Sequence, residues 1–123
     1  MNVKHNKLVD EIMKINPKIR FVGIYRKGDY STKLKEGLES YLNEEETKES
    51  MKQAIIRMNT RKLHAHKIGK THYAIAKYDK ISRITIPFGN DGLILITTES
   101  DAEYDPIGEK ILELRNIFED SLS

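Results

Sequence analysis

The sequence lacks cysteine altogether, and it has no long apolar run. Without cysteine the chain has no disulfide, no thiolate metal ligand and no cysteine nucleophile, which fits a reducing compartment. The longest uninterrupted apolar run is Leu93–Ile96, whereas a membrane-spanning helix needs about 20 apolar residues. No apolar signal-peptide region follows Met1–Lys7. These absences predict a soluble, cytoplasmic protein with no membrane partner.

A strong net charge of either sign is also missing, although charge is segregated along the chain. Charged residues make up 33% of the sequence, yet the formal net charge is only +2. Residues 57–83 hold eight basic residues against one acid, and residues 99–123 hold eight acids against two basic residues. The two segments could attract each other within one chain or between two copies, or both could be ordinary solvated faces.

The first part of the chain reads as a helix followed by a hairpin. Apolar residues recur at helical spacing over residues 3–15, and Asn16-Pro17 ends that pattern because proline disfavours helix at and before its position. Ile19–Tyr25 is rich in strand-forming residues, with Ile19 and Phe21 expected on one face. Lys27-Gly28-Asp29 predicts a turn into a short second strand over residues 30–33.

A long helix is predicted to begin after Asn43. The Asn43 side chain can cap the free amides, and Glu46 stands at the third helical position, where it can reach back to complete a capping box. The apolar stripe of this helix extends to about His64 or His66 and comprises Met51, Ala54, Ile55, Met58 and Ala65. Ile68-Gly69 breaks the pattern.

After that break the apolar period changes from 3.6 to 2. Three strands are predicted, over residues 71–78, 81–88 and 93–98, and the short joints between them require antiparallel neighbours. Leu93–Ile96 is apolar at every position, which predicts burial on both faces of the sheet by helices or by a partner. Asp105-Pro106 predicts the start of a last helix, with Asp105 as its cap.

These elements define an α+β fold in which helices flank a five-stranded, mostly antiparallel sheet. The predicted order is α-β-β-α-β-β-β-α within a single domain of residues 1–123. The order resembles the roadblock/LC7 and longin-like domains of the profilin-like architecture, and it is similar to small archaeal proteins of roadblock-like build. The resemblance rests on Ile19–Tyr25 with its Gly28 turn, on the Ile68-Gly69 step and on the alternation through residues 88–96.

The resemblance implies a non-catalytic, regulatory protein-interaction module without a cofactor. Members of these families form homodimers or heterodimers, often through the second helix and an edge strand, and they act beside small GTPases. A homodimer, and a protein partner such as a small GTPase, are therefore expected. The surface would be the sheet edge near residues 81–88 or the exposed side of residues 47–66. The expected interaction residues are Met51, Ile55, Arg57, Arg61, Lys62, Ile84 and Ile86.

Two alternatives from other functional classes stay open. A PAS-like or profilin-like sensor of a small ligand predicts a cavity lined by residues such as Phe21, Tyr73 and Phe88. A nucleic-acid-binding protein predicts a continuous basic face on the 57–83 segment, although the sequence has no RNP-type or helix-turn-helix signature. That face would include Arg57, Arg61, Lys62, Lys77 and Arg83.

The residues best suited by type to bind a metal ion are three histidines, His64, His66 and His72. Imidazoles are common zinc ligands, but the first two would point about 200° apart on a helix. Surface histidines are therefore the preferred interpretation, and no metal site is predicted. No nucleophile motif, glycine-rich phosphate loop or buried acid pair indicates catalysis, so no catalytic or cofactor-binding residue is assigned.

Overall fold

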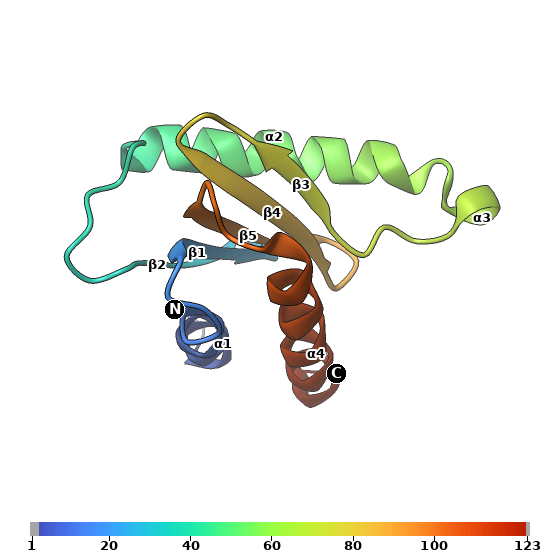
Figure 1. The fold of residues 1–123 in the computed structure, drawn as a ribbon. Helices are drawn as coiled ribbons and strands as arrows, with labels where there is room; N and C mark the ends of the chain where they lie inside the picture. Colours follow the sequence, from blue (N-terminus) through green and yellow to red (C-terminus); the bar gives the residue numbers. More distant parts are fainter. Residues whose placement is uncertain (1–2, 123) are drawn as a thin grey trace.

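The computed structural model describes the backbone of residues 3–122 and the side chains of residues 3–119. Figure 1 shows the order of the elements, which confirms the predicted α+β architecture and adds one short helix, α3. The elements are α1 (Val3–Met13), β1 (Ile19–Arg26), β2 (Asp29–Leu34), α2 (Glu44–Lys62), α3 (Ala65–Ile68), β3 (Ala74–Lys77), β4 (Ile81–Phe88), β5 (Gly92–Glu99) and α4 (Tyr104–Leu122).

The five strands form one sheet in the order β2-β1-β5-β4-β3. Every neighbouring pair is antiparallel. The long-range pairing of β1 with β5 joins the two hairpin-containing halves of the chain and places β5 at the centre of the sheet, between β1 and β4. The edges are β2 and β3, so the edge that we expected near residues 81–88 is in fact the inner strand β4.

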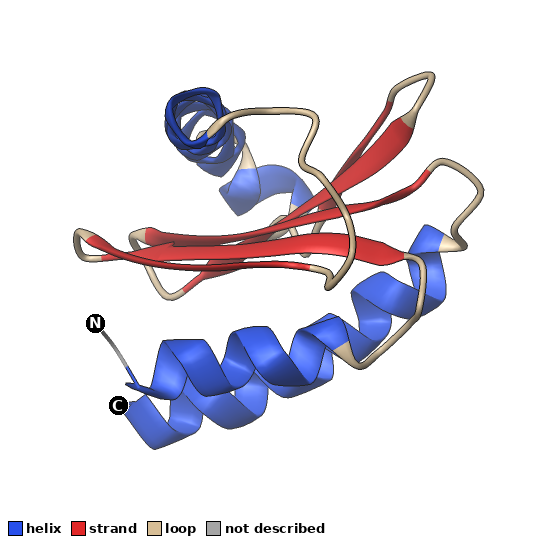
Figure 2. Ribbon diagram, turned by 90° about the vertical axis from the view of Figure 1, so that its left-hand side faces the viewer, coloured by secondary structure: helices blue, strands red, loops and turns tan. Residues whose placement is uncertain are grey.

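Helices cover both faces of the sheet. Figure 2 shows α1 and α4 side by side below the sheet and α2 on the opposite face. All four side chains of Leu93–Ile96 are at most 1% exposed. Ile94 and Ile96 pack in the cluster formed with α1 and α4, and Leu93 packs against Ala54 and Met58 of α2. The predicted burial of this segment on both faces is confirmed, and the chain itself supplies both layers.

The two faces of the sheet differ in how many apolar side chains they bury. The main core lies between the sheet and the α1–α4 pair, where alternate residues of β4 and β5 meet Leu8, Ile12, Ile107 and Ile111. Full burial of each large aliphatic side chain contributes about 1.5–3 kcal/mol. On the α2 side the buried cluster consists of Ala54, Met58 and Leu93, with Ile55 packed against it, and Met51 and Leu95 are also buried there. The α1–α4 side therefore carries most of the hydrophobic stabilisation.

The predicted N-terminal cap of α2 is confirmed. The Asn43 side chain accepts from the Glu46 amide at 2.8 Å, and the Glu46 carboxylate accepts from the Asn43 amide at 3.0 Å. At its other end α2 stops at Lys62, so Ala65 belongs to α3 and not to the long stripe.

Two local predictions are wrong. A register shift between Ile19 and Phe21 places Ile19 in the core on the α1–α4 side, whereas Phe21 lies on the α2 side near Met51. A bulge inserts one residue, and because side chains alternate along a strand it changes which face the following residues occupy. Helix α4 begins at Tyr104, so Asp105 is in its first turn and is not its cap. The Asp105 carboxylate instead accepts a hydrogen bond from Tyr73 at 2.6 Å.

Candidate interaction surface

Polar residues at four-residue spacing form a row that winds along α2. The row comprises Glu45, Glu49, Gln53, Arg57 and Arg61. Residues four apart are neighbours on a helix surface, but each step advances the row by about 40° around the helix axis. The row borders grooves between α2 and the β3–β4 hairpin, which are also lined by Tyr78 and Arg83. We call these five residues the α2 stripe; its first half is acidic and its second half is basic.

The charges of the α2 stripe are not neutralised by ion pairs. Within the described part of the chain, the ion pair of α2 is Lys48–Glu44, and neither residue belongs to the stripe. Gln53 donates to the Glu49 carboxylate at 3.1 Å. The wider basic segment behaves in the same way: none of its eight basic residues forms an ion pair with a described carboxylate. The acidic tail therefore does not neutralise the basic segment within the described structure.

Apolar side chains flank the stripe. Ile56 of α2 is 56% exposed, Leu63 just after the end of α2 is 67% exposed, and Tyr78 in the β3–β4 turn is 54% exposed. Next to Tyr78, β3 forms an edge of the sheet with no further strand among the described residues. Exposed apolar groups next to a free strand edge are typical of protein interaction surfaces.

The structure separates the interaction residues expected from the sequence into two groups. Arg57 and Lys62 are exposed, while Ile55 and Arg61 are half-buried. The other three, Met51, Ile84 and Ile86, are 0% exposed and belong to the core. They have no surface for a partner, because Met51 faces the sheet under α2 and the two isoleucines point toward α1 and α4. Of the first group, Arg57 and Arg61 belong to the α2 stripe, whereas Ile55 packs against Ala54 and Met58.

Sequence reasoning missed Glu45, Glu49 and Gln53 as members of this surface. The signal was nevertheless present in the sequence, because glutamate, glutamine and arginine recur at four-residue spacing with opposite charges on the two sides of Gln53.

The basic residues proposed for nucleic acid do not form one continuous face. Arg57, Arg61 and Arg83 line one groove on the α2 side of the sheet. Arg83 is held there by a hydrogen bond to Ser50, and its buried Nε has no partner among the described groups. Lys77 lies on the other side, where its ammonium donates to the Ser100 carbonyl and stands over the Tyr104 ring. Because side chains alternate along β3 and β4, these basic residues lie on both faces of the sheet and not on one.

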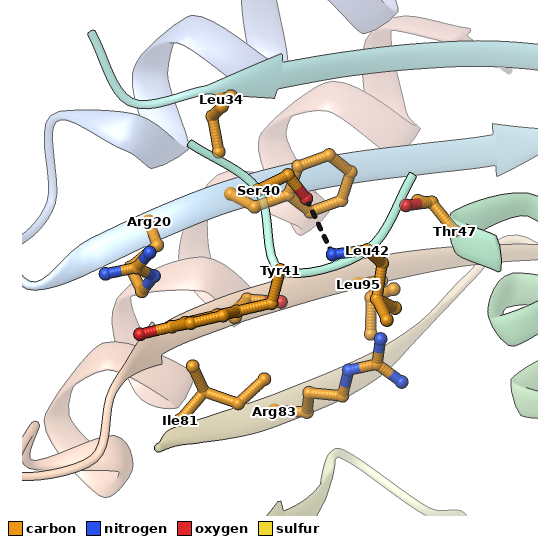
Figure 3. Close-up of a pocket in the computed structure, with 11 residues that line it drawn as sticks. Arg20, Leu34, Ser40, Tyr41, Leu42, Thr47, Ile81, Arg83 and Leu95 are labelled. Carbon is orange, nitrogen blue, oxygen red and sulfur yellow. Dashed lines mark hydrogen bonds between the residues drawn. The ribbon is translucent and has the colours of Figure 1, made fainter. Parts of the chain in front are cut away.

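The segment between β2 and α2 covers part of the sheet on the α2 side. Figure 3 shows Tyr41 lying between Arg20 and the β4 residue Ile81, with Leu42 directed toward Leu95. The Arg20 and Lys80 cations lie 4.8 and 5.4 Å from the centre of the Tyr41 ring. The cavity beneath has a volume of only about 30 Å³, which is the space of one water molecule.

The residues expected to line a ligand cavity are not brought together. Phe21 lies on the α2 side of the sheet, whereas Phe88 is 0% exposed in the core on the opposite side. Tyr73 packs at Gly108 of α4. The described structure therefore has no shared cavity for these three rings.

The three histidines are exposed and stand on different local elements. His64 lies between α2 and α3, His66 is in α3, and His72 precedes β3. Among the described residues, no group of three histidine, aspartate or glutamate side chains is placed to hold a metal ion. No described helix is long and apolar enough to cross a membrane.

Comparison with solved structures identifies the fold. A roadblock/LC7 domain from Streptomyces avermitilis matches with a TM-score of 0.73 and 10% identity, over 95% of this chain and 96% of that chain. MglB from Myxococcus xanthus matches with a TM-score of 0.73 and 13% identity, over 97% of this chain and 87% of that chain. A structure described as MglB with a tetrameric arrangement gives 0.71 and 10% identity, over 100% and 95% of the two chains.

The chain has the roadblock/LC7 fold. Because the sequence identities are so low, these matches establish the architecture and not the activity. No family model matches the sequence, and no curated protein matches it. The predicted resemblance to the roadblock fold is confirmed, whereas the similarity to archaeal proteins stays a prediction.

Proposed function

We propose that this protein is a non-catalytic, regulatory protein-interaction module that acts as a homodimer through the exposed part of α2. The observation that carries the proposal is the charge symmetry of the α2 stripe. If two copies of α2 pack antiparallel about a twofold axis at Gln53, Glu49 of each copy comes level with Arg57 of the other along the helix axis, and Glu45 comes level with Arg61 further from the centre. Because a twofold interface uses the same surface of both copies, each pairing occurs twice.

The charges and the apolar groups have different roles in this dimer. Exposed ion pairs contribute only about 0.2–1 kcal/mol each, so the stripe sets orientation and register more than affinity. Burial of Ile56, Leu63 and Tyr78, which are all more than half exposed in one copy, supplies the hydrophobic part. The free edge of β3 lies beside the same surface.

A charge-swap experiment tests this arrangement. One variant carries Arg57→Glu with Arg61→Glu, which makes the whole stripe acidic. The other carries Glu45→Lys with Glu49→Lys, which makes it basic. Each variant alone is expected to dimerise roughly tenfold more weakly than the wild type, because like charges meet at every pairing. An equal mixture of the two should recover the wild-type affinity as a heterodimer, measured by sedimentation equilibrium.

A control variant with the same number of charge changes distinguishes the stripe from net charge. Lys7→Glu with Lys27→Glu alters two exposed lysines, on α1 and on the β1–β2 turn, and should leave dimerisation unchanged. A wild-type protein that is strictly monomeric would overturn the proposal, as would a mixture that dimerises no better than its components. Circular dichroism confirms that each variant is folded.

A small GTPase is the partner class that the roadblock resemblance suggests for such a dimer. A homodimer presents two copies of each surface, which suits a module that brings partners together without chemistry of its own. Pull-down of purified GTPases in both nucleotide states would test this part independently of dimerisation.

A further inference from the structure

A second surface feature lies at the opposite end of α2 from the capping box. It is a groove between the end of α2, residues 70–72, the β4–β5 turn and α4, with a volume of about 460 Å³. Small-molecule sites usually measure about 300–1,000 Å³. The groove, which we call the turn groove, is lined by Met58, Lys62, Ala65, Lys70, Thr71, His72, Pro87, Gly89, Asn90, Arg115 and Glu119.

The polar lining of the turn groove is predominantly basic. Lys62, Lys70 and Arg115 contribute three positive charges, and His72 adds an imidazole that can donate a hydrogen bond. Glu119 is the one acid among the lining residues. Cationic side chains that converge from three elements create a positive local field, which raises the local concentration of anions.

Two of the cations are fixed in position by backbone carbonyls. The Lys62 ammonium donates to the Asn90 carbonyl at 2.7 Å, and the Arg115 guanidinium donates to the Pro87 carbonyl at 3.2 Å. These bonds satisfy one donor of each group without neutralising its charge. Neither side chain forms an ion pair with a described carboxylate, so both charges remain available.

The wall that carries Lys70 and His72 is anchored by the next residue. The Tyr73 hydroxyl donates to the Asp105 carboxylate at 2.6 Å, and that hydrogen bond is the main reason that the pKa of Tyr73 is raised to about 12. The Tyr73 ring also lies against Gly108 of α4. In contrast, neither Lys70 nor His72 has a hydrogen bond or ion pair to a described group, so both are free to contact a ligand.

The acid in the lining is already engaged by the protein. The Glu119 carboxylate accepts a hydrogen bond from the Gly89 amide at 2.6 Å. This hydrogen bond fixes the Glu119 carboxylate at the β4–β5 turn without neutralising its charge, so the groove carries three cations against one anion.

We propose that the turn groove binds a small organic anion that carries phosphate or carboxylate groups. Lys70, His72 and Lys62 contact its charged group, and the carbon skeleton rests against Met58, Ala65 and Pro87. This binding does not depend on dimerisation through the α2 stripe, because of the eleven lining residues none belongs to the stripe.

A titration followed by amide resonances in two-dimensional NMR spectra tests the proposal. Pyrophosphate and the tricarboxylate tricarballylate are added separately to the full chain at constant ionic strength, which holds general screening fixed. We expect saturable shifts at the amides of residues 70–72, 89 and 90 with at least one probe. The probe that binds more tightly identifies phosphate or carboxylate as the preferred group.

Matched lysine variants separate a built site from general attraction to a basic surface. Lys70→Gln should weaken binding of the preferred probe roughly fivefold, because it removes a charged contact. Lys67→Gln removes the same charge from α3, outside the lining, and should leave the affinity unchanged. Absence of saturable shifts with both probes would overturn the proposal. Equal weakening by the two variants would also overturn it, since it would mean diffuse attraction.

Discussion

Gly92, at the start of β5, is the glycine at which the fold leaves the least room for a side chain. A Cβ atom there would lie 2.7 Å from the Tyr25 carbonyl oxygen and would also collide with the Phe88 carbonyl oxygen. Both obstacles are backbone atoms, which cannot rotate away. Gly92→Ala is therefore expected to lower the free energy of unfolding by at least about 2 kcal/mol in urea denaturation.

Gly37 provides the matched control for this prediction. It has a φ of +85°, but no atom lies within 4 Å of a Cβ placed there. Gly37→Ala should cost only about 1 kcal/mol, the strain of a left-handed backbone conformation. Equal losses in the free energy of unfolding for the two substitutions would contradict the close approach of β1 and β4 to Gly92.

His5 links stability to pH at the residue scale. It is a buried residue of α1, and its ring centre lies 5.4 Å from that of Phe88. Burial lowers the pKa of His5 below its ordinary value of 6.5; Arg26 lowers it further, and Asp29 opposes the shift. As the pH falls, the unfolded chain takes up this proton before the folded chain does. The stabilisation is thus complete above pH 6.5 and is lost progressively below it.

Chemical denaturation between pH 7 and pH 5 measures this effect. The wild type should lose stability as the pH falls over this range. His5→Phe removes the titrating group but keeps a ring, so its stability should depend less steeply on pH. Identical slopes for the two proteins would show that His5 is not the group responsible.

At the scale of elements, the capping box is the device that fixes where α2 begins. Asn43→Ala removes the acceptor for the Glu46 amide, and loss of such a cap costs about 1 kcal/mol. Thermal unfolding should show a correspondingly lower midpoint. Asn59→Ala is the control, because Asn59 is exposed within the same helix and alanine has the higher helix propensity. A cap variant as stable as wild type would contradict the role of Asn43.

The elements themselves could be predicted from the sequence wherever one periodicity dominated. The alternation in β4 and the continuous apolar run in β5 indicated their burial correctly, because sheet packing depends directly on side-chain alternation. The Asn43–Glu46 box was recognisable for a similar reason, since it depends only on local residues.

Features that depend on tertiary contacts could not be predicted in this way. The bulge after Ile19 arises from pairing with β5, nearly eighty residues later in the chain, and reassigns Phe21 to the α2 side. The strand predicted over residues 71–78 covers only Ala74–Lys77, and Tyr73 just before it bonds to Asp105 of α4. Asp105 likewise takes a tertiary partner in place of the predicted capping role.

At the scale of the whole molecule, the candidate surface was only partly predictable. The sequence indicated that residues 47–66 form a helix with one exposed side. It could not tell that Met51 points inward onto Gly23, where a Cβ would lie 3.3 Å from the Met51 sulfur. Nor could it place Lys70 and His72 opposite α4 in the turn groove, because that requires the complete sheet order.

The smaller apolar layer under α2 fits the proposal that this helix contacts a partner. Most apolar burial is on the α1–α4 side, so the outer side of α2 is free to carry charge and exposed isoleucine. This division of roles leads to the central claim, that a second copy packs on α2.

Intermolecular NOE measurements on a mixture of isotope-labelled and unlabelled protein test that claim most directly. The antiparallel arrangement about Gln53 predicts contacts from the Ile56 and Leu63 methyl groups of one copy to α2 protons of the other. Contacts that place the amino-terminal halves of the two α2 helices together would contradict the antiparallel register. The absence of any intermolecular contact in α2 would contradict the dimer itself.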